Sequence, residues 1–319
     1  MVNKKYFIIT VDTEGDDLWS WSPSKDITTR CSKFIPRFQE LCERYSFIPV
    51  YLTNYEMALD DFWVDYGKKK QQEGKCEIGM HLHAWNSPPL YSLTNVFGSN
   101  PYITEYPLKI VRKKVCFLKT FLEERFDSLI VSHRSGRWST NQEYLEILVN
   151  NGILVDCSFT PGLDLSYLPG FSKMAGSNYR RIKHRSFFHS SGIYEIPMST
   201  FVSRKNDGGS FKHRLKTLFK GNYKWLRPIN ISLKEMIDIV NHFRQSDYIE
   251  FMIHSSELMP GGSPYFKDEE EIEELYNKLD SFFSYLAKKG YIGVSLKDFY
   301  ELKTTEKKKI FKNSSNENS

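Results

Sequence analysis

Short apolar runs rich in β-branched and aromatic residues alternate along the chain with longer stretches that have helical patterns. The short runs predict strands, and the longer stretches predict helices. The expected strands are residues 6–11, 47–52, 76–81, 129–133, 153–156, 194–196, 248–254 and 291–295. The expected helices are residues 30–45, 106–126, 141–150, 233–244 and 268–288. This alternation predicts an α/β fold with a mainly parallel sheet, either open or closed into a barrel.

Polar side chains that can do chemistry stand where the expected strands end. In chain order they are Asp12, Glu14, His81, His83, Arg134, Asp156 and His254. In α/β folds, reactive side chains gather where strands end and loops begin. The pattern therefore predicts a functional site that is built from the ends of several strands.

Two of these strand ends carry pairs of potential metal ligands. Asp12 and Glu14 point the same way on an extended chain, and so do His81 and His83, because side chains alternate along a strand. Imidazole together with carboxylate is a usual ligand set for zinc and other transition metals. Taken singly, the pairs are more simply explained as a solvated acidic turn and as two surface histidines. Their joint presence at strand ends favours a metal site.

Composition narrows the class of protein. The chain has 319 residues, of which 40% are hydrophobic and 26% are charged, as is ordinary for a globular protein. A mean hydropathy of −0.48 and the lack of a long uncharged apolar run argue against a membrane-spanning helix. The apolar stretch near the start of the chain is too short for a secretion signal. The five cysteines include no Cys-x-x-Cys pair. We therefore expect a cytoplasmic protein with reduced thiols.

The net charge of +5 is unevenly distributed. Residues 204–227 contain eight Lys or Arg and one Asp, and the chain from residue 303 contains five Lys and two Glu. We expect a single domain over residues 1–302, with a basic insertion around 203–228. Residues 303–319 would form a polar, basic and disordered tail.

Within the insertion, residues 210–220 show an amphipathic helical pattern with basic groups beside an apolar face. One interpretation is a helix that lies peripherally on the inner face of a membrane. The simpler interpretation is an ordinary helix packed on the domain. The basic segments contain no recognisable nucleic-acid-binding motif, so no nucleic acid is expected as a partner.

The candidate residues, in their order and spacing, resemble the polysaccharide deacetylase superfamily, also called the NodB-homology or carbohydrate esterase 4 superfamily. The resemblance covers most of residues 5–300. It implies a distorted (β/α) barrel of NodB-homology type and a metal-dependent hydrolase that removes N-acetyl or O-acetyl groups from sugars. More narrowly, the chain is similar to the deacetylase homologues that accompany genes for bacterial lipopolysaccharide and surface-polysaccharide biosynthesis. The motif blocks that carry the resemblance centre on Asp12-Thr13-Glu14, His81-Leu82-His83, Arg134-Ser135-Gly136-Arg137-Trp138, Asp156 and His254.

The resemblance implies a role for each candidate. Asp12 matches the catalytic base that activates the water held by the metal, and Arg134 matches the arginine that orients this base. His254 matches the general acid, and Asp156 matches the acid that holds the catalytic histidine. An imidazole titrates near neutrality, which suits a group that protonates a leaving amine.

The implied cofactor is one divalent metal ion, zinc in the first place, with cobalt, manganese and nickel as alternatives. Glu14, His81 and His83 would bind it. At this point the chain departs from the family pattern, because Thr13 replaces the usual metal-binding Asp and Trp85 stands where the second His usually follows. Glu14 and His83 are therefore the substitute ligands.

An acetylated sugar or glycan intermediate is the expected partner, with an N-acetyl group favoured. Trp138 lies where an aromatic residue walls the family's groove. Arg137, Trp85 and Glu257 are the other candidates for substrate binding.

Two further functions compete with this prediction. The first is a non-catalytic barrel that binds a glycan or scaffolds a biosynthetic complex, which Thr13 and the displaced histidine favour. The second is a metal-dependent phosphoesterase, since acidic and histidine clusters on α/β barrels also serve that chemistry. The joint presence of Asp12, Arg134, Asp156 and His254 favours catalysis over binding alone.

Overall fold

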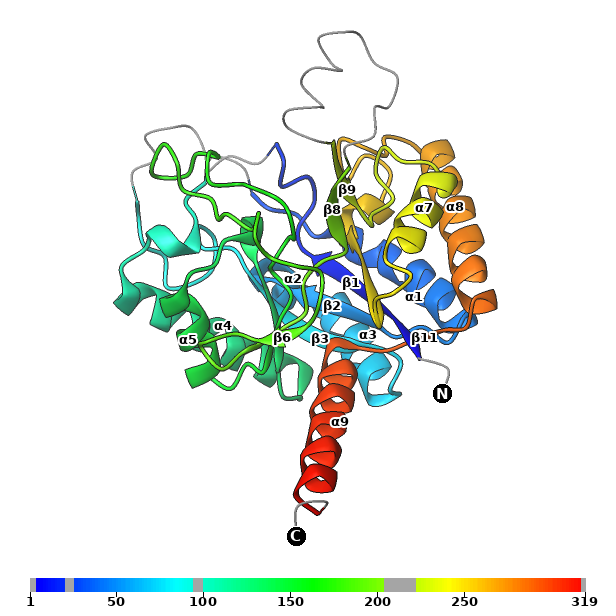
Figure 1. Cartoon of the computed structure of the whole chain (residues 1–319). Coiled ribbons are helices and arrows are strands. Elements are labelled where there is room, and N and C mark those ends of the chain that lie inside the picture. Colours follow the sequence, from blue (N-terminus) through cyan, green and yellow to red (C-terminus); the bar gives the residue numbers. More distant parts are fainter. Residues whose placement is uncertain (1–3, 21–25, 94–99, 204–221, 317–319) are drawn as a thin grey trace, which may run out of the picture.

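A curved, mostly parallel sheet forms the centre of the molecule, and helices pack around it (Figure 1). The computed structural model describes residues 4–20, 26–93, 100–203 and 222–316. The strand order is β10-β1-β2-β3-β4-β5-β7-β6, and β11 also pairs with β1. Of these pairs, only β6 with β7 is antiparallel. The strands are β1 Lys5–Thr13, β2 Pro49–Thr53, β3 Glu77–Leu82, β4 Ser132–Ser135, β5 Val155–Asp156, β6 Phe187–Phe188, β7 Tyr194–Glu195, β10 Tyr248–His254 and β11 Tyr291–Gly293.

Helices alternate with most of these strands, as a parallel sheet requires. The α-helices are α1 Ile35–Arg44, α2 Tyr55–Leu59, α3 Asp61–Gln72, α4 Leu108–Phe126, α5 Gln142–Asn150, α7 Leu233–His242, α8 Glu269–Lys288 and α9 Leu296–Asn316. Single 3-10 turns occur at η1 Arg30–Phe34, η2 Ile103–Glu105, η3 Gly136–Trp138 and η4 Ser255–Leu258. The predicted distorted (β/α) barrel is confirmed.

Strand β1 is paired along both of its edges. Strand β10 follows one of its edges from Tyr6 to Asp12, whereas β11 and β2 share the other edge, β11 at its start and β2 at its end. Because neighbours and helices cover it on all sides, Phe7, Ile8 and Ile9 are fully buried. This explains why its sequence is a continuous apolar run and not an alternating one.

Every strand and helix that the apolar pattern predicts is present, with ends displaced by a few residues at most. The pattern missed α2, α3 and the short β6. Helix α3 buries only Trp63, Val64 and Gly67 on its inner side, and its many lysines and glutamines hide the period. The predicted capping box at the start of α7 is confirmed, because Ser232 and Glu235 exchange hydrogen bonds.

Two strands that the pattern also missed lie at the start of the expected basic insertion and inside it. Strands β8 Thr200–Ser203 and β9 Asn222–Trp225 form a separate antiparallel pair. Between them, the amphipathic segment 210–220 and its expected membrane contact lie outside the described residues.

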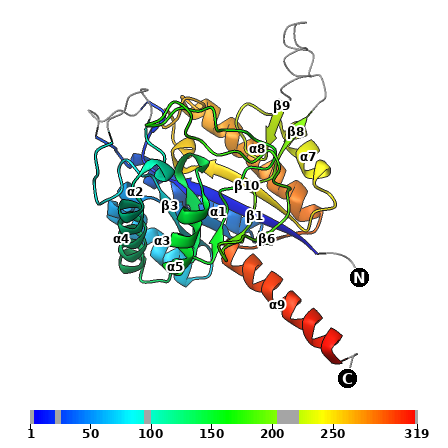
Figure 2. The same ribbon diagram turned by 60° about the vertical axis from the view of Figure 1, so that its left-hand side comes forward.

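Residues 303–316 are helical where we expected a disordered tail. They continue α9, which begins with the buried side chains of Leu296 and Phe299 and extends away from the sheet (Figures 1 and 2). Lys303 forms an ion pair with Asp247, and Thr304 donates a hydrogen bond to the carbonyl oxygen of Tyr300. Forming the first turn is the costly step of helix formation. In α9 this turn is anchored in the core, so the polar residues that follow can extend the helix.

In the described parts of the chain, no helix is both long and apolar enough to cross a membrane. All five cysteines carry free thiols, and all except Cys116 are buried.

Gly79 provides a test of how closely the central strands pack. A Cβ atom at this position of β3 would lie 2.4 Å from Ser132 Oγ and 2.7 Å from Leu52 Cδ2. We expect Gly79→Ala to lower the free energy of unfolding by about 1–3 kcal/mol, because overpacking forces neighbours to move. Denaturant titration checks this, with the exposed Lys109→Ala on α4 as control, for which a change within about 0.5 kcal/mol is expected. Equal stabilities of the two variants would contradict close packing of β3 on β2 and β4.

Candidate metal centre and active site

The carboxyl ends of β1, β3, β4 and β10 bring the candidate residues together. In the parallel register, Asp12 of β1 lies opposite His254 of β10, and His81 of β3 lies opposite Arg134 of β4. Residues that are remote in sequence therefore meet at the same edge of the sheet, where parallel strands usually place their functional groups.

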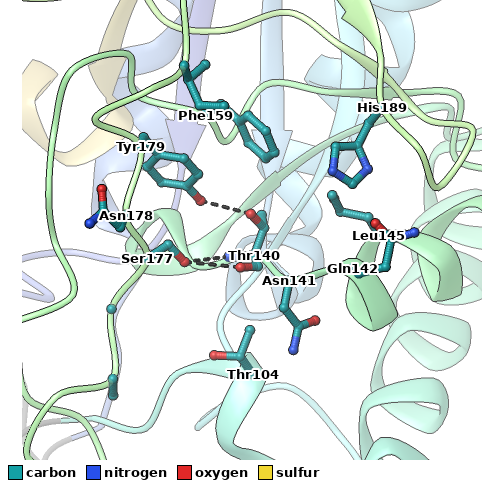
Figure 3. Close-up of a pocket in the computed structure, with 13 residues that line it drawn as sticks. Thr104, Thr140, Asn141, Gln142, Leu145, Phe159, Ser177, Asn178, Tyr179 and His189 are labelled. Carbon is teal, nitrogen blue, oxygen red and sulfur yellow. Dashed lines mark hydrogen bonds between the residues drawn. The ribbon is translucent and has the colours of Figure 1, made fainter.

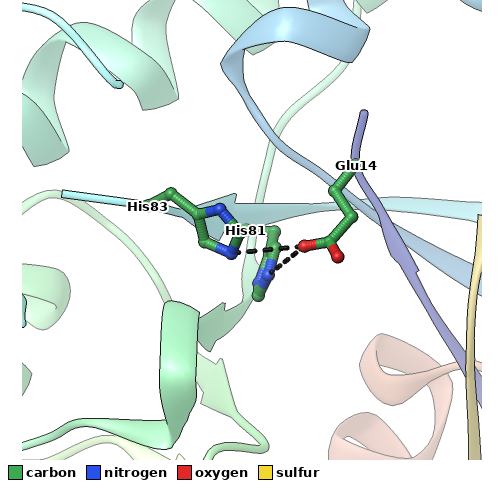
Figure 4. A group of neighbouring side chains, drawn as sticks. All are labelled: Glu14, His81 and His83. Atoms are coloured by element: carbon green, nitrogen blue, oxygen red, sulfur yellow. Dashed lines mark ion pairs between the residues drawn. The ribbon is translucent and has the colours of Figure 1, made fainter. Parts of the chain in front are cut away.

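Glu14, His81 and His83 form a buried cluster at this edge (Figure 4). The Oε2 atom of Glu14 lies 3.4 Å from His81 Nε2 and 3.2 Å from His83 Nε2. One donor atom from each of the three side chains lies within 4.8 Å of the other two. The two imidazoles and the carboxylate thus face one small space from two strand ends.

The ring of His81 is held in one orientation. Its Nδ1 lies 3.0 Å from the backbone carbonyl oxygen of Arg134, which can only accept, so Nδ1 carries the hydrogen and Nε2 is turned towards Glu14. Burial lowers the pKa of His81, but the charges of Asp12 and Glu14 raise it more, and the net pKa is above its usual value. The point between Nε2 and the carboxylates therefore attracts a cation.

His83 experiences the opposite balance. Burial and the neighbouring His81 hold the pKa of its imidazole well below the usual value, so the ring is neutral and has a lone pair to offer. Trp85 stacks on the ring with centroids 4.3 Å apart, which restricts its rotation. Within the described residues, His83 Nδ1 has no hydrogen-bond partner although it is buried.

The cluster fits a single divalent metal ion by the chemistry of its donors. Two imidazoles and one carboxylate are a usual protein ligand set for zinc. The hydrogen bond from His81 to a carbonyl oxygen is the outer contact that metal-binding histidines commonly make. Both imidazoles turn their Nε2 atoms towards the same carboxylate oxygen, Oε2 of Glu14. The predicted trio of Glu14, His81 and His83 is thus assembled in space.

Asp12 lies beside this cluster in contact with a fully buried arginine. Arg134 donates a hydrogen bond to Asp12 Oδ1 and another to Glu250. Burial raises the pKa of Asp12, but Arg134, His81 and His254 lower it more, so the carboxylate stays ionised. Its Oδ2 lies 4.0 Å from His81 Nε2 and 3.9 Å from His254 Nε2, which places it between the cluster and His254.

The partner of His254 is Glu257 and not Asp156, which corrects the sequence-based prediction. His254 Nδ1 lies 2.8 Å from Glu257 Oε1, and Glu257 also accepts a hydrogen bond from Arg227. The 3-10 turn η4 directly after β10 brings position 257 back to position 254. Burial lowers the pKa of His254, but Glu257 and Glu14 raise it more, and the net pKa lies above the usual value.

Asp156 belongs to a different histidine. The register of β4 and β5 places it opposite His133, and its Oδ1 lies 2.7 Å from His133 Nδ1. Tyr144 of α5 lies 2.9 Å from the other ring nitrogen. Because neighbouring side chains on β4 point to opposite faces, His133 is directed away from the face that carries Arg134.

The remaining predicted residues lie around this centre, but they differ in their contacts. Trp138 packs over the Arg134 guanidinium, with 4.7 Å from Cζ to the ring centroid, and contacts Trp225 edge to face. Arg137 is bound by the carbonyl oxygen of Pro169 and lies over the ring of Tyr102. Arg137 thus has structural partners, whereas Trp138 borders the centre.

Sequence reasoning missed several residues that support the site, because each stands inside an element or a loop without a motif. Glu250 is buried in the middle of β10, where a lone acid in an apolar strand was the available signal. Glu56 of α2 accepts hydrogen bonds from Gly15 N and from Asn86 Nδ2. It thereby ties the loop after β1 to the loop after β3, which hold Glu14 and His83. Lys114 of α4 is buried and donates to the carbonyl oxygens of Ser87 and Pro89 in the same second loop.

Comparisons with known proteins show similarity of fold. No protein-family model and no curated protein sequence matches the chain. A Mycobacterium smegmatis protein assigned provisionally as a polysaccharide deacetylase has a similar structure, with a TM-score of 0.56 and 12% identity over 96% of this chain and 93% of that one.

Two other solved structures are more distant. The 4-alpha-glucanotransferase of Thermococcus litoralis has a TM-score of 0.53 and 11% identity over 94% of this chain but 40% of its own. A family 4 carbohydrate esterase of Streptomyces lividans has a TM-score of 0.44 and 10% identity over 91% of both chains. The similarities to the first two proteins show the fold of the chain, and the second protein is matched over less than half of its length.

We expect Glu56→Ala to weaken metal binding, because the two loops that hold Glu14 and His83 lose their shared acceptor. Changes to groups that orient ligands typically cost about 10–100-fold in metal affinity. A zinc titration with a competing chelator measures this. The exposed acid Glu40 on α1 offers a matched control as Glu40→Ala, for which no change is expected. Unaltered affinity in Glu56→Ala would show that the loops hold their positions without it.

Glu250 predicts a pH dependence of stability. Burial raises its pKa to about 8, although Arg134 acts against this. The carboxyl therefore keeps its proton more readily in the folded state than in the unfolded state, where its pKa is about 4.3. Its stabilising contribution is complete below about pH 4.3 and is lost as the pH rises towards 8.

We expect Glu250→Gln, which stays neutral, to gain stability relative to the wild type between these pH values, and the difference to level off above pH 8. Denaturant titrations at several pH values measure it. A difference that stays constant across this range would mean that Glu250 is already ionised in the fold.

Proposed function

We propose that the protein is a metal-dependent hydrolase that removes an acetyl group, most readily an N-acetyl group, from a sugar or a sugar-containing biosynthetic intermediate. The observation that carries this proposal is the meeting of Glu14, His81 and His83 with Asp12 and His254 at one edge of the sheet. Such a site contains the three elements that amide hydrolysis needs, namely a Lewis-acid site, a base and an acid.

Glu14, His81 and His83 would hold the metal ion, with zinc preferred for two imidazoles and one carboxylate, and cobalt, manganese or nickel as alternatives. When bound, the ion would act as a Lewis acid that polarises the acetyl carbonyl and makes water more acidic. His81 and His83 contribute by presenting Nε2 from rings that a carbonyl oxygen and Trp85, respectively, keep in place.

Asp12 would accept the proton of the attacking water. Its carboxylate lies beside the three ligands, and Arg134 fixes it through Oδ1 while Oδ2 stays directed towards His81 and His254. Arg134 is fully buried, so its guanidinium is held by its hydrogen bond to Asp12. The same hydrogen bond restricts the movement of the Asp12 carboxylate.

His254 would protonate the leaving amine. It lies across the cluster from His81, with Nε2 at 3.8 Å from Glu14 Oε1, while Glu257 receives Nδ1–H and holds the ring. Glu257 therefore serves as a positioning residue for His254 and not as a substrate-binding residue. Trp19 packs edge to face on His254 at 5.0 Å and, with Trp138, offers apolar surface for a sugar ring.

Other activities on this fold fit the site less well. The Thermococcus litoralis protein is a glucanotransferase, and glycosyl transfer by a retaining mechanism uses a pair of carboxylates and gives no role to the two imidazoles that meet Glu14 here. A non-catalytic role has one observation in its favour. Thr13, at the position of the family's metal-binding Asp, donates its hydroxyl to the carbonyl oxygen of Val11 and thus adds no ligand.

The function is tested by three variants that separate metal binding from turnover. We expect His81→Ala to lose both bound metal and the release of acetate from oligomers of N-acetylglucosamine. Asp12→Asn and His254→Ala should keep the metal, and His254→Ala should lower kcat by about 10²–10⁴-fold, the range for general acid–base catalysis. Metal content is measured by elemental analysis and acetate by an enzyme-coupled assay.

The exposed imidazole of His242 provides the control, because His242→Ala removes a histidine from the surface of α7 and should change neither quantity. Full metal occupancy in His81→Ala would remove this residue from the ligand set. Stoichiometric metal without acetate release from any acetylated sugar, in the wild type with zinc, cobalt or manganese, would leave the glycan-binding role as the better account.

A further inference from the structure

A cavity of about 440 Å³ lies beside the start of α5, and its lining includes none of Glu14, His81 and His83 (Figure 3). Its walls come from three segments, namely residues 140–145, the chain from 159 to 189, and Thr104. In Figure 3 the rings of Phe159 and Tyr179 lie on one side, and Asn141 with Thr104 on another. The volume lies within the range of about 300–1,000 Å³ that is common for small-molecule sites.

The lining of this cavity contains aromatic and hydrogen-bonding groups but no permanent charge. None of its thirteen lining residues is Asp, Glu, Lys or Arg. Burial lowers the pKa of His189, so its imidazole is neutral near pH 7. A charged ligand such as a phosphate or a uronate would find no counter-ion here and would lose its hydration without compensation.

Two side chains have hydrogen-bonding atoms that the described residues do not use. Asn141 caps α5 by accepting a hydrogen bond from Tyr144 N at its Oδ1, so its amide NH₂ group is available. His189 contacts Ser191 through Nδ1, so Nε2 is available. Both side chains line the cavity, and in Figure 3 His189 lies above Asn141.

The aromatic wall is held rigid by its own hydrogen bonds. The hydroxyl of Tyr179 lies 2.9 Å from Thr140 Oγ1 and donates to the backbone carbonyl oxygen of Trp138 at 2.6 Å. Ser177 donates to the carbonyl oxygen of Thr140 and accepts from its N–H. A preformed wall saves the entropy that ordering would otherwise cost on binding.

The 3-10 turn η3 connects this cavity to the candidate active site. Gly136 packs so closely on His83 that a Cβ atom would lie 2.3 Å from His83 Cδ2. Two residues later, Trp138 contacts Arg134 with its ring and Tyr179 with its carbonyl oxygen. The cavity is therefore a short distance along the chain from the residues that border the catalytic centre.

We propose that this cavity binds one neutral pyranose unit, with the apolar face of the sugar against the aromatic wall and its hydroxyls on Asn141 and His189. A sugar combines an apolar ring face with many hydroxyls and no charge, and these are the properties of the lining. The inference rests on the proposed function only in taking the bound sugar to be part of the glycan that carries the acetyl group.

Binding is tested in a His81→Ala background, so that the result does not depend on turnover. The probe is the trimer of N-acetylglucosamine, titrated calorimetrically, with maltotriose as an unacetylated neutral sugar and trigalacturonate as an acidic one. Asn141→Ser keeps a capping oxygen but removes the amide, and His189→Ala removes the imidazole. Each is expected to raise the dissociation constant about fivefold or more, the effect of one lost hydrogen bond.

Asn241→Ser, at an exposed position of α7 far from the cavity lining, is the matched control and should bind like its parent. In the otherwise native chain, the double variant Asn141→Ser, His189→Ala should raise KM and leave kcat and the unfolding midpoint unchanged. The proposal is overturned if the double variant binds the trimer as tightly as its parent, if no neutral trimer binds, or if trigalacturonate binds more tightly. If the sugar binds at the cavity but the protein releases no acetate, only the proposed deacetylation is refuted.

Discussion

The buried guanidinium of Arg134 is the interaction on which the candidate site depends. Removing a positive charge from water is costly, and it is tolerated here because Asp12 and Glu250 accept its hydrogen bonds from two other strands. Those two acidic side chains stand on β1 and β10, while the arginine stands on β4. The guanidinium therefore finds both acceptors only when three strands that are far apart in sequence come together in the correct register.

The same residue links the two halves of the proposed chemistry. The side chain of Arg134 holds the base, Asp12, while its backbone carbonyl oxygen receives the Nδ1–H of His81. A displacement of β4 would thus disturb both the proposed base and one of the proposed metal ligands. This shared support explains why the cluster can be compact and buried, although its members come from separate loops and strands.

Two histidine–carboxylate pairs with different surroundings lie near the centre. His254 and Glu257 lie at the cluster, and their pairing is local, because a single 3-10 turn brings position 257 back to position 254. His133 and Asp156 are joined across neighbouring strands and are fully buried, with Tyr144 beside them. The first pair faces the cluster, where the proposed function places a proton donor, whereas the second is fully buried and joins β4 to β5.

The linear order of residues determined the alternation of strands and helices, since burial on both faces of a parallel sheet requires continuous apolar runs such as residues 6–11. It also indicated that Asp12, Glu14, His81 and His83 stand at strand ends. The partners of these groups were decided by the tertiary structure alone. Strand register paired Asp156 with His133, and no local pattern could connect Glu250 to Arg134 or Glu56 to Gly15, because these contacts span 116 and 41 positions. Periodicity reports which face of an element is buried, whereas the identity of the residue on the other side of the contact depends on how the sheet is assembled.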